Sequence, residues 1–385
     1  MTEGAPKADE VEQLAAATLF DEDSEVTEEQ LEEESAPDPD PAQVAYSTTD
    51  FDVEGLVRRL KRGDIVIPTF GQEPLVADEP LETARFQRPF VWLKSQMDRF
   101  VESLLLGYPI PGVFLVQQTD RRYLVLDGQQ RLRTLAAFYQ GVVNKKEFSL
   151  QSVAERFKGL TYETLSAEQR RQIDNTFIQA TIVQAQPTVS SLDAIYQIFE
   201  RLNSGGTQLT PHEIRIALYA GDFVGWLTML SESTEWRELY GKAARHLRDQ
   251  ELILRIIALN VTPGTYKRPL KKYLNDVMAA HRNLDKLATA NLELCFKGPA
   301  PLLVEAVGPS VIRPYGSAVN SALTEALFVG LMGRLQIDVP STDDVRAAIE
   351  NLLRNPEMTA SFTRATADEE NVRKRLALAK QAFAK

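Results

Sequence analysis

The stretch Asp127-Gly128-Gln129-Gln130-Arg131 follows a short apolar run and precedes a helical one. This pattern predicts a β-strand that ends at an acid, turns at a glycine and opens a helix. Glycine permits a tight turn, and a helix N-terminus presents N–H groups and a positive dipole end to an anion. Arg131 could grip phosphate oxygens through two hydrogen bonds, and Asp127 could hold Mg²⁺. The stretch is therefore typical of a phosphate or metal-phosphate site; the alternative is that Asp127 caps the helix and pairs with Arg131 structurally.

The sequence around this turn predicts an α+β fold. Apolar residues recur at helical spacing from Leu93 to Leu105, and two strands, 113–117 and 123–126, form a predicted hairpin across Asp120-Arg121. A third strand is expected at 177–183, which gives a small mixed-sheet domain over residues 51–188. Residues 189–385 are expected to form a mostly α-helical domain, with helices near 192–202, 249–260, 269–281, 322–335 and 342–353.

The charge of the chain is unevenly divided. Residues 1–50 contain 16 Asp and Glu and the single Lys7, a net charge of −15, whereas the rest of the chain carries +4. The first 50 residues are also poor in aromatic side chains and include a run of alternating Pro and Asp, a composition that cannot bury enough surface to fold. We therefore expect residues 1–50 to form a disordered acidic tail, which either stays free or lies against the basic body as a mimic of a polyanion.

The basic residues of the body gather in four clusters, at 58–62, 121–122, 267–272 and 373–375. Each cluster is expected to form a solvated face or to contact DNA. No apolar run approaches the length of a membrane span, and the start of the chain lacks the pattern of a signal peptide. We therefore expect a cytoplasmic protein without a membrane partner.

Cysteine and histidine are scarce. The one cysteine, Cys295, excludes an internal disulfide and is expected to be a small core residue. Thr210-Pro211-His212-Glu213 is a helix-start pattern with proline at the first helical position, so His212 is expected to be exposed in the first turn and not to act as a base. Asn203 precedes a glycine turn between two predicted helices and either caps a helix end or hydrogen-bonds a ligand.

Three motifs occur in a fixed order: Phe86-Gln87-Arg88-Pro89-Phe90-Val91-Trp92, then residues 127–131, then Phe199-Glu200-Arg201-Leu202-Asn203 with a Gly-Thr that follows. In order and spacing they resemble the N-terminal domain of the GmrSD-type modification-dependent restriction endonucleases. The resemblance runs from about residue 51 to about residue 281. It implies that the mixed-sheet domain has the ParB and sulfiredoxin fold.

The resemblance also implies one pocket that binds ATP or GTP and hydrolyses its phosphoric anhydride bond to license DNA cleavage in phage defence. In that pocket, arginines neutralise phosphate charge, an acid holds Mg²⁺ or orients water, and amides position the attacking water. Trp92 and Phe199 would be packing or base-stacking neighbours. The catalytic residues implied by similarity are Asp127, Gln129, Gln130 and Arg131, with Asp127 as the Mg²⁺ ligand. The implied nucleotide- and phosphate-binding residues are Gln87, Arg88, Gly128, Asn203, Trp92 and Phe199.

The chain departs from the family pattern in two places. Ile67-Pro68 is separated from Gln87 by an insertion rich in Glu and Pro, whereas the family usually has Ile-Pro directly before its first Gln-Arg. No histidine follows His281, so the histidine-built nuclease domain with which full-length members end is not expected here. We therefore predict a nucleotide-dependent sensor or regulatory subunit of a DNA-directed, restriction-like defence system. Its expected partners are DNA and a separate nuclease or effector chain, with oligomer formation left open.

Two other functions fit the same residues. The first is a ParB-like nuclease that acts on DNA in this pocket; it would need a second metal-binding acid, for which Glu200 is the nearest candidate by motif. The second is a non-enzymatic interaction module, in which the 127–131 motif stabilises the fold and the basic helices bind DNA or a partner chain.

Overall fold

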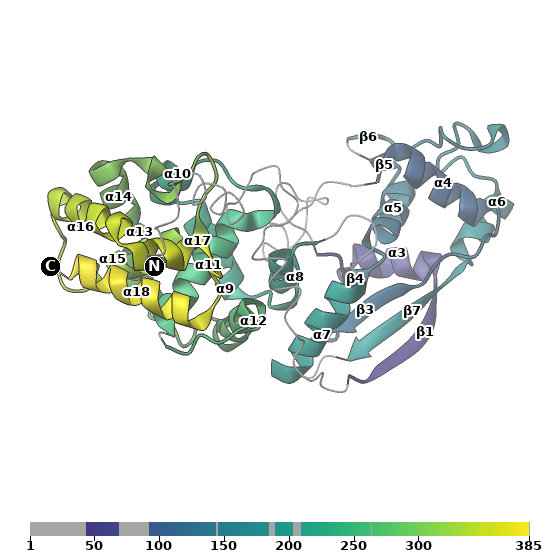
Figure 1. Cartoon of the computed structure of the whole chain (residues 1–385). Coiled ribbons are helices and arrows are strands. Elements are labelled where there is room, and N and C mark those ends of the chain that lie inside the picture. Colours follow the sequence, from purple (N-terminus) through teal and green to yellow (C-terminus); the bar gives the residue numbers. More distant parts are fainter. Residues whose placement is uncertain are drawn as a thin grey trace, which may run out of the picture. The chain divides into compact units, whose positions relative to one another are not determined.

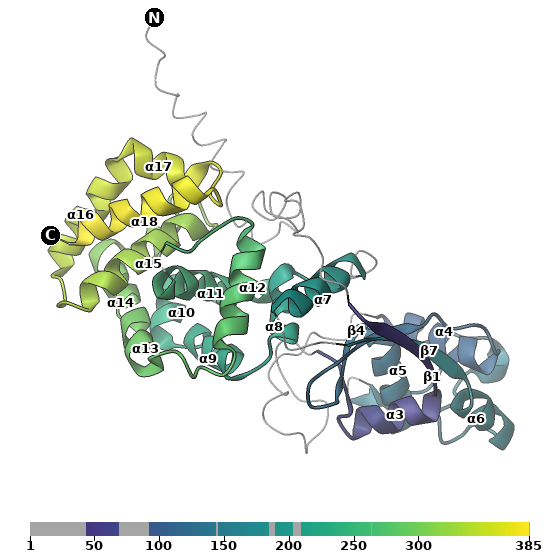
Figure 2. The ribbon, with the colours of Figure 1, turned by 90° about the horizontal axis from the view of Figure 1, so that it is seen from below.

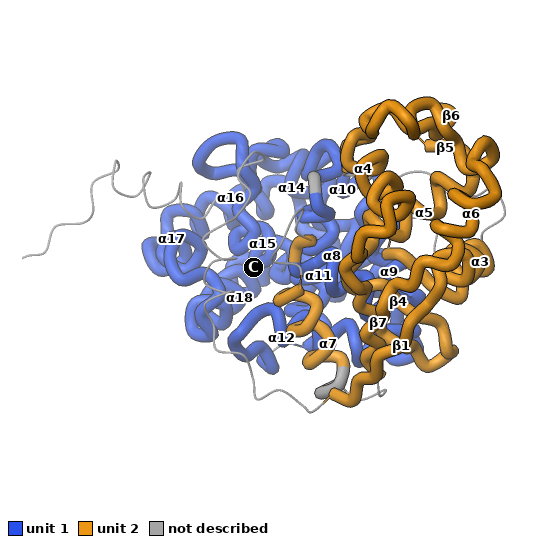
Figure 3. The backbone as a smooth tube through the Cα atoms, turned by 90° about the vertical axis from the view of Figure 1, so that its right-hand side faces the viewer, with its two compact units in different colours: residues 1–39, 211–385 blue, residues 40–210 orange. Residues whose placement is uncertain are grey.

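The structure is a computed structural model that describes residues 44–68, 92–143, 145–184, 189–202, 209–262 and 264–384. Figure 1 and Figure 2 show its helices and strands in two views. The chain divides into two compact units, shown in Figure 3: unit 1 contains residues 1–39 and 211–385, and unit 2 contains residues 40–210. Each unit is described by itself.

Unit 2 contains a five-stranded mixed sheet with the strand order β1-β7-β3-β4-β2. The pairs β1–β7 and β3–β4 are antiparallel, whereas β3–β7 and β2–β4 are parallel. The predicted hairpin and the predicted third strand are both present, as β3, β4 and β7. The strands are β1 Tyr46–Asp52, β2 Ile65–Val66, β3 Val113–Gln117, β4 Tyr123–Asp127 and β7 Phe177–Gln184.

The predicted acidic tail was drawn too long at its C-terminal end. Residues 46–50 belong to β1, because the backbone from Tyr46 to Asp52 pairs with β7 along its whole length. The first five side chains of the strand are exposed and four of these are polar, since the strand lies at the edge of the sheet. The rest of the predicted tail, residues 1–43, lies outside the described residues.

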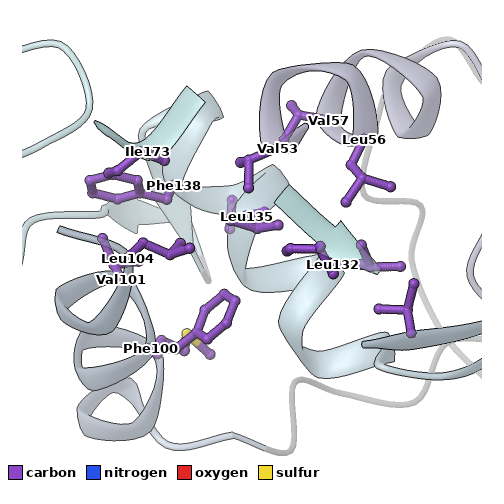
Figure 4. Close-up of a cluster of buried hydrophobic side chains, with 14 of the residues drawn as sticks. Val53, Leu56, Val57, Phe100, Val101, Leu104, Leu132, Leu135, Phe138 and Ile173 are labelled. Atoms are coloured by element: carbon purple, nitrogen blue, oxygen red, sulfur yellow. The ribbon is translucent and has the colours of Figure 1, made fainter. Parts of the chain in front are cut away.

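Four helices of unit 2 share one apolar core with the sheet, and Figure 4 shows part of it. Val53, Leu56 and Val57 come from α3, while Leu132, Leu135 and Phe138 come from α5. The apolar stripe predicted from Leu93 forms α4, which buries Phe100, Val101 and Leu104 in the same core. The helices are α3 Val53–Lys61, α4 Lys94–Leu105, α5 Gln129–Gln140 and α6 Ala167–Asp174; the small elements are β5 Val142–Val143, β6 Lys146–Glu147 and η1 Glu155–Phe157.

Helix α7, Val189–Leu202, also lies in unit 2. It contacts β4 and buries Ile195 and Phe199. The sequence analysis began the helical domain at residue 189, whereas the boundary between the two compact units along the chain lies after residue 210. The apolar side of α7 explains the difference, because a helix is placed by the surface that it buries and not by the composition of the segment that follows it.

Unit 1 is helical throughout its described part. α15 is its central helix: it contacts α11, α13, α14, α17 and α18 and is buried on nearly all sides. A Cβ at Gly330 would lie 2.8 Å from Phe383 and 3.1 Å from Ala379, so glycine permits α18 to approach closely. The elements are α8 Pro211–Leu218, α9 Asp222–Ser231, α10 Thr234–Tyr240, η2 Arg245–Leu247, α11 Arg248–Val261, α12 Leu270–His281, α13 Thr289–Lys297, α14 Pro299–Val307, η3 Pro309–Ile312, α15 Ser321–Leu335, α16 Thr342–Arg354, α17 Pro356–Thr363 and α18 Glu369–Phe383.

Polar side chains in the core of unit 1 correct two expectations. Arg375, in the basic cluster 373–375, is 1% exposed and donates to Glu325, which also accepts from Arg255, so this position does not belong to a solvated face. His212 is fully buried and not exposed, because all of α8 from His212 to Leu218 is buried. Cys295 is buried, as expected.

The described part of the chain confirms the α+β class: a small mixed sheet with its helices is followed by a helical unit. The specific likeness to the ParB and sulfiredoxin fold remains a prediction. In the part of the chain that the structure covers, every helix is too short or too polar to cross a membrane.

Candidate functional site

The turn between β4 and α5 has the predicted form. β4 ends at Asp127, Gly128 adopts the left-handed conformation with φ 93°, and α5 begins at Gln129. A Cβ at residue 128 would lie 2.5 Å from Cγ1 of Val113, so both the backbone conformation and the space demand glycine. No side chain caps the N-terminus of α5, so Asp127 is not its cap. The first N–H groups of a helix have no hydrogen-bond partner within the helix. At α5 the N-cap residue is Gly128, which has no side chain that could accept from them.

Asp127 and Arg131 form an ion pair across the first turn of α5. Nη2 of Arg131 donates to Oδ2 of Asp127 at 2.8 Å. Nη1 of Arg131 donates to the carbonyl oxygens of Pro111 and Gly112, which precede β3, the second of these at 2.8 Å. The Asp127 side chain is 45% exposed and that of Arg131 is 14% exposed. The guanidinium therefore ties the turn to the start of β3, while the carboxylate faces solvent on part of its surface.

Gln130 and Arg133 point to other parts of the chain. Oε1 of Gln130 accepts a hydrogen bond from the backbone N–H of Trp92 at 3.4 Å. Nη2 of Arg133 donates to the carbonyl oxygen of Pro68 at 3.1 Å. Pro68, which precedes the insertion, and Trp92, which ends the motif after it, are thus both bonded to side chains from the first two turns of α5.

The aromatic site candidates contribute to packing. The half-buried ring of Trp92 meets that of Phe100 edge-on, with centroids 5.6 Å apart. Phe199 is fully buried on α7, the helix that contacts β4. An edge-on aromatic contact is a favourable packing arrangement, which agrees with the packing alternative for Trp92. Full burial of Phe199 likewise agrees with packing, since a side chain that stacks on a base must expose one face of its ring.

The structure therefore groups most of the candidates that it describes. Residues 127–131 form one turn, and Trp92 is bonded to that turn. Phe199 lies on a helix against the strand that delivers the turn. Gln87, Arg88 and Asn203 lie outside the described residues, so their predicted roles remain predictions.

Sequence reasoning missed Arg133. This side chain is 6% exposed, and burial lowers its pKa to about 10. The signal was present as a charged residue inside an otherwise apolar helical run, between Leu132 and Leu135. An arginine on the buried side of a helix is costly unless something compensates its charge.

The donors of a metal site are sparse around the turn. Nowhere in the described ranges do three or more His, Cys, Asp or Glu side chains gather in a way that could hold a metal ion. One oxygen of Asp127 is already engaged by Arg131. Mg²⁺ is commonly held by only one or two carboxylates together with water and substrate phosphates. The residues present thus fit Mg²⁺ only in company with a phosphate ligand.

Comparison with known proteins gives one family. Residues 73–220 match the family model described as GmrSD restriction endonuclease, N-terminal domain. The matched segment contains all three motifs and extends from the insertion before Gln87 to the end of α8. Neither a curated protein nor a solved structure gives a significant match to the chain. The resemblance to the GmrSD N-terminal domain is thereby confirmed for this segment.

Proposed function

We propose that this chain, whose residues 73–220 match the GmrSD N-terminal domain model, is a nucleotide-dependent regulatory subunit of a DNA-directed, restriction-like phage-defence system. The family match carries this proposal, because it spans every segment in which the sequence predicts a site residue. The turn at 127–131 supports it further, since a helix start that follows a left-handed glycine is a favourable place for a phosphate group.

The chain's own residues suggest a division of roles in nucleotide hydrolysis. The N–H groups at the start of α5 hold a phosphate in the ground state. Asp127, half-exposed beside them, orients the attacking water or joins phosphate oxygens in holding Mg²⁺, and Gln129 positions the water. A bound Mg²⁺ would supply neutralisation of the charge that develops on the phosphate oxygens.

Arg131 has a different part in this proposal from the one that the family resemblance implies. Its guanidinium already donates to Asp127 and to the two carbonyl oxygens before β3. We assign to it the task of fixing the Asp127 carboxylate and the turn, so that the catalytic groups are held in place before the ligand arrives. Gln130 similarly holds the backbone of Trp92.

DNA and a separate nuclease chain are the proposed partners. The family description names a restriction endonuclease, and such an enzyme cuts DNA. Residues 282–385 contain no histidine, and the structure describes them as packed helices up to residue 384. A nuclease supplied by another polypeptide fits this composition better than one built from these helices.

One experiment tests the proposal against its two alternatives. The purified full chain is incubated with ATP, with GTP and with plasmid DNA, each with and without Mg²⁺, and phosphate release and DNA nicking are both measured. We expect Mg²⁺-dependent phosphate release from a nucleotide and no nicking. Nicking without phosphate release would support the ParB-like nuclease, and neither activity would support the interaction module.

A further inference from the structure

Arg133 differs from the other buried arginines of the described chain. Four arginines are buried there, and three of them lie near a carboxylate: Arg255 and Arg375 share Glu325, and Arg215 lies 3.9 Å from Glu251. Arg133 is 6% exposed and forms no ion pair with any acid in the described ranges. Its hydrogen-bond partner is a neutral carbonyl oxygen, that of Pro68.

A buried cation without a counter-charge is energetically costly. A carbonyl oxygen satisfies one of the five guanidinium N–H donors but does not neutralise the charge. Burial alone lowers the pKa of Arg133 to about 10, which reflects the same cost. An anion that binds beside Arg133 would neutralise this charge. The free energy released by that neutralisation would add to the affinity of the protein for the anion.

The position of Arg133 points to the start of α5 as the place where that anion binds. Arg133 follows Gln129 by four residues and Gln130 by three, so the three side chains lie on one face of the helix. Long side chains in a helix lean toward its N-terminus, which brings Arg133 back over the first turn. Arg131 faces elsewhere, toward Asp127 and the carbonyl oxygens before β3.

We propose that Arg133 supplies the positive charge that binds a phosphate group at the start of α5, while Arg131 holds the turn in place. The ligand chemistry is a phosphate oxyanion, which a nucleoside triphosphate or the backbone of DNA could provide. This inference deepens the proposed function and rests on it for the identity of the ligand. The contact between Arg133 and a phosphate oxyanion can be tested without knowing which molecule carries the phosphate.

Anion binding by the full chain tests the inference. Binding of inorganic pyrophosphate, ATP, GTP and a short DNA duplex is measured by calorimetry at low ionic strength, beside the melting temperature with and without each ligand. The variants are Arg133→Met, which removes the charge, and Arg133→Lys, which retains it. Arg170→Met is the matched control, because Arg170, like Arg133, donates to backbone carbonyl oxygens in unit 2 but lies on α6.

We expect Arg133→Met to weaken pyrophosphate binding by about tenfold or more, since it removes a hydrogen bond between two charged groups. Arg133→Lys should restore part of the affinity, and Arg170→Met should bind as the unaltered protein does. Without an anion, Arg133→Met should melt no lower than Arg133→Lys, because it loses a charge that no acid of the described ranges neutralises. Stabilisation by nucleotides supports a nucleotide as the source of the phosphate; stabilisation by the duplex alone supports the Arg133 contact but contradicts nucleotide dependence.

Three results would overturn the inference. Equal pyrophosphate affinities for the unaltered protein and Arg133→Met would do so, and the proposed function would stand if nucleotide hydrolysis persisted. Without anion, a melting temperature that is lower for Arg133→Met than for the charge-retaining Arg133→Lys would mean that the charge at this position stabilises the free protein, as it would beside an acid. Failure of every phosphate ligand to bind the unaltered protein would also overturn it, and the hydrolysis assay would then decide the proposed function separately.

Discussion

Arginine and carboxylate meet in both units of the chain, but under different conditions. In unit 2, Arg131 and Asp127 pair at the end of a strand, and the carboxylate is 45% exposed. In unit 1, Glu325 on α15 accepts from Arg255 on α11 and from Arg375 on α18, each at 2.5 Å, and all three side chains are at most 5% exposed. The same two chemical groups thus form a partly exposed ion pair in unit 2 and a fully buried set of ion pairs in unit 1.

The difference in burial determines what each pair can do. Charges taken out of water depend on each other, so removal of one partner from the buried triad leaves an uncompensated charge. A solvent-exposed pair is worth little to stability because water screens it and solvates either partner alone. The partly exposed carboxylate of Asp127 can therefore replace its contact with water by a contact with a ligand. Glu325, in contrast, joins three helices.

The largest effect is expected at Glu325. Glu325→Gln should lower the free energy of unfolding by about 3–5 kcal/mol, because both arginines lose the counter-charge that they share. Urea unfolding followed by tryptophan fluorescence measures this change. The matched control is Glu350→Gln, which breaks the exposed pair with Arg354 and should cost less than about 0.5 kcal/mol. Similar losses in the two variants would remove the contrast between buried and exposed pairs.

The second effect is a pH dependence at His212. Burial and the neighbouring Arg215 lower the pKa of His212 to about 3, while Nε2 of its ring lies 3.2 Å from Oε1 of Gln250. A histidine whose folded pKa lies below its unfolded value loses stability on acidification, since the unfolded chain takes up the proton first. His212 should therefore cost the folded state about 2 kcal/mol between pH 7 and pH 5.

The measurement compares the unaltered protein with His212→Gln at both pH values. Trp92→Phe in both backgrounds restricts the fluorescence signal to unit 1, because the other two tryptophans, Trp226 and Trp236, lie there. His281, whose pKa is also lowered by burial, remains in both proteins, so its contribution cancels in the comparison. An equal loss on acidification in both proteins would contradict the assignment to His212.

The contrast between units also explains what the sequence could predict. In unit 1, the helices α11, α12, α15 and α16 lie where the apolar pattern predicts them, and in unit 2 the hairpin β3–β4 follows from alternation and its turn. β1 was missed because an edge strand can be largely polar, as the segment 47–50 within it is. The burial of His212 was missed because a helix-start pattern specifies where a helix begins but not what packs around it.

In the candidate site, the features set by local sequence were predictable, whereas the tertiary contacts were not. The glycine turn and the pairing of Asp127 with Arg131 follow from local sequence, since a helix brings positions four apart together. The carbonyl oxygens of Pro111 and Gly112 that engage Arg131 come from a segment about 20 residues away, and local patterns do not encode that contact. The burial of Arg133 depends on how α5 packs in unit 2, which is likewise a tertiary property.

A third, smaller effect on stability is expected at the exposed pair. Asp127→Asn should lower the free energy of unfolding by about 1 kcal/mol or less, because the carboxylate is 45% exposed and Arg131 keeps its bonds to two carbonyl oxygens. Under the proposed function it should reduce nucleotide turnover by roughly 100-fold and leave nucleotide binding nearly unchanged, since the carboxylate acts on water or metal and not on the ground-state phosphate. Initial rates and binding constants of the two proteins measure this split. Metal-dependent DNA nicking that Asp127→Asn abolishes, with no nucleotide hydrolysed by either protein, would instead favour the nuclease.

The smallest effect on stability, and a clear one on association, is expected from removal of residues 1–43. This deletion spares β1 and takes away 15 Asp and Glu with Lys7, a net charge of −14, from a chain whose other residues are mildly basic. The free energy of unfolding should change by less than about 0.5 kcal/mol. Affinity for a DNA duplex at low salt should rise by roughly tenfold, because the polyanionic segment repels the duplex and competes with it for basic surface. The gain should shrink as salt screens both interactions.

A full-length variant with Gln and Asn in place of the acids of residues 1–43 separates the effect of charge from that of bulk: it should bind DNA as tightly as the truncated protein. Equal affinities of the truncated and unaltered proteins at low salt would show that the acidic segment does not act on DNA binding, which would leave the difference between the exposed turn and the buried core as the main electrostatic contrast of the molecule.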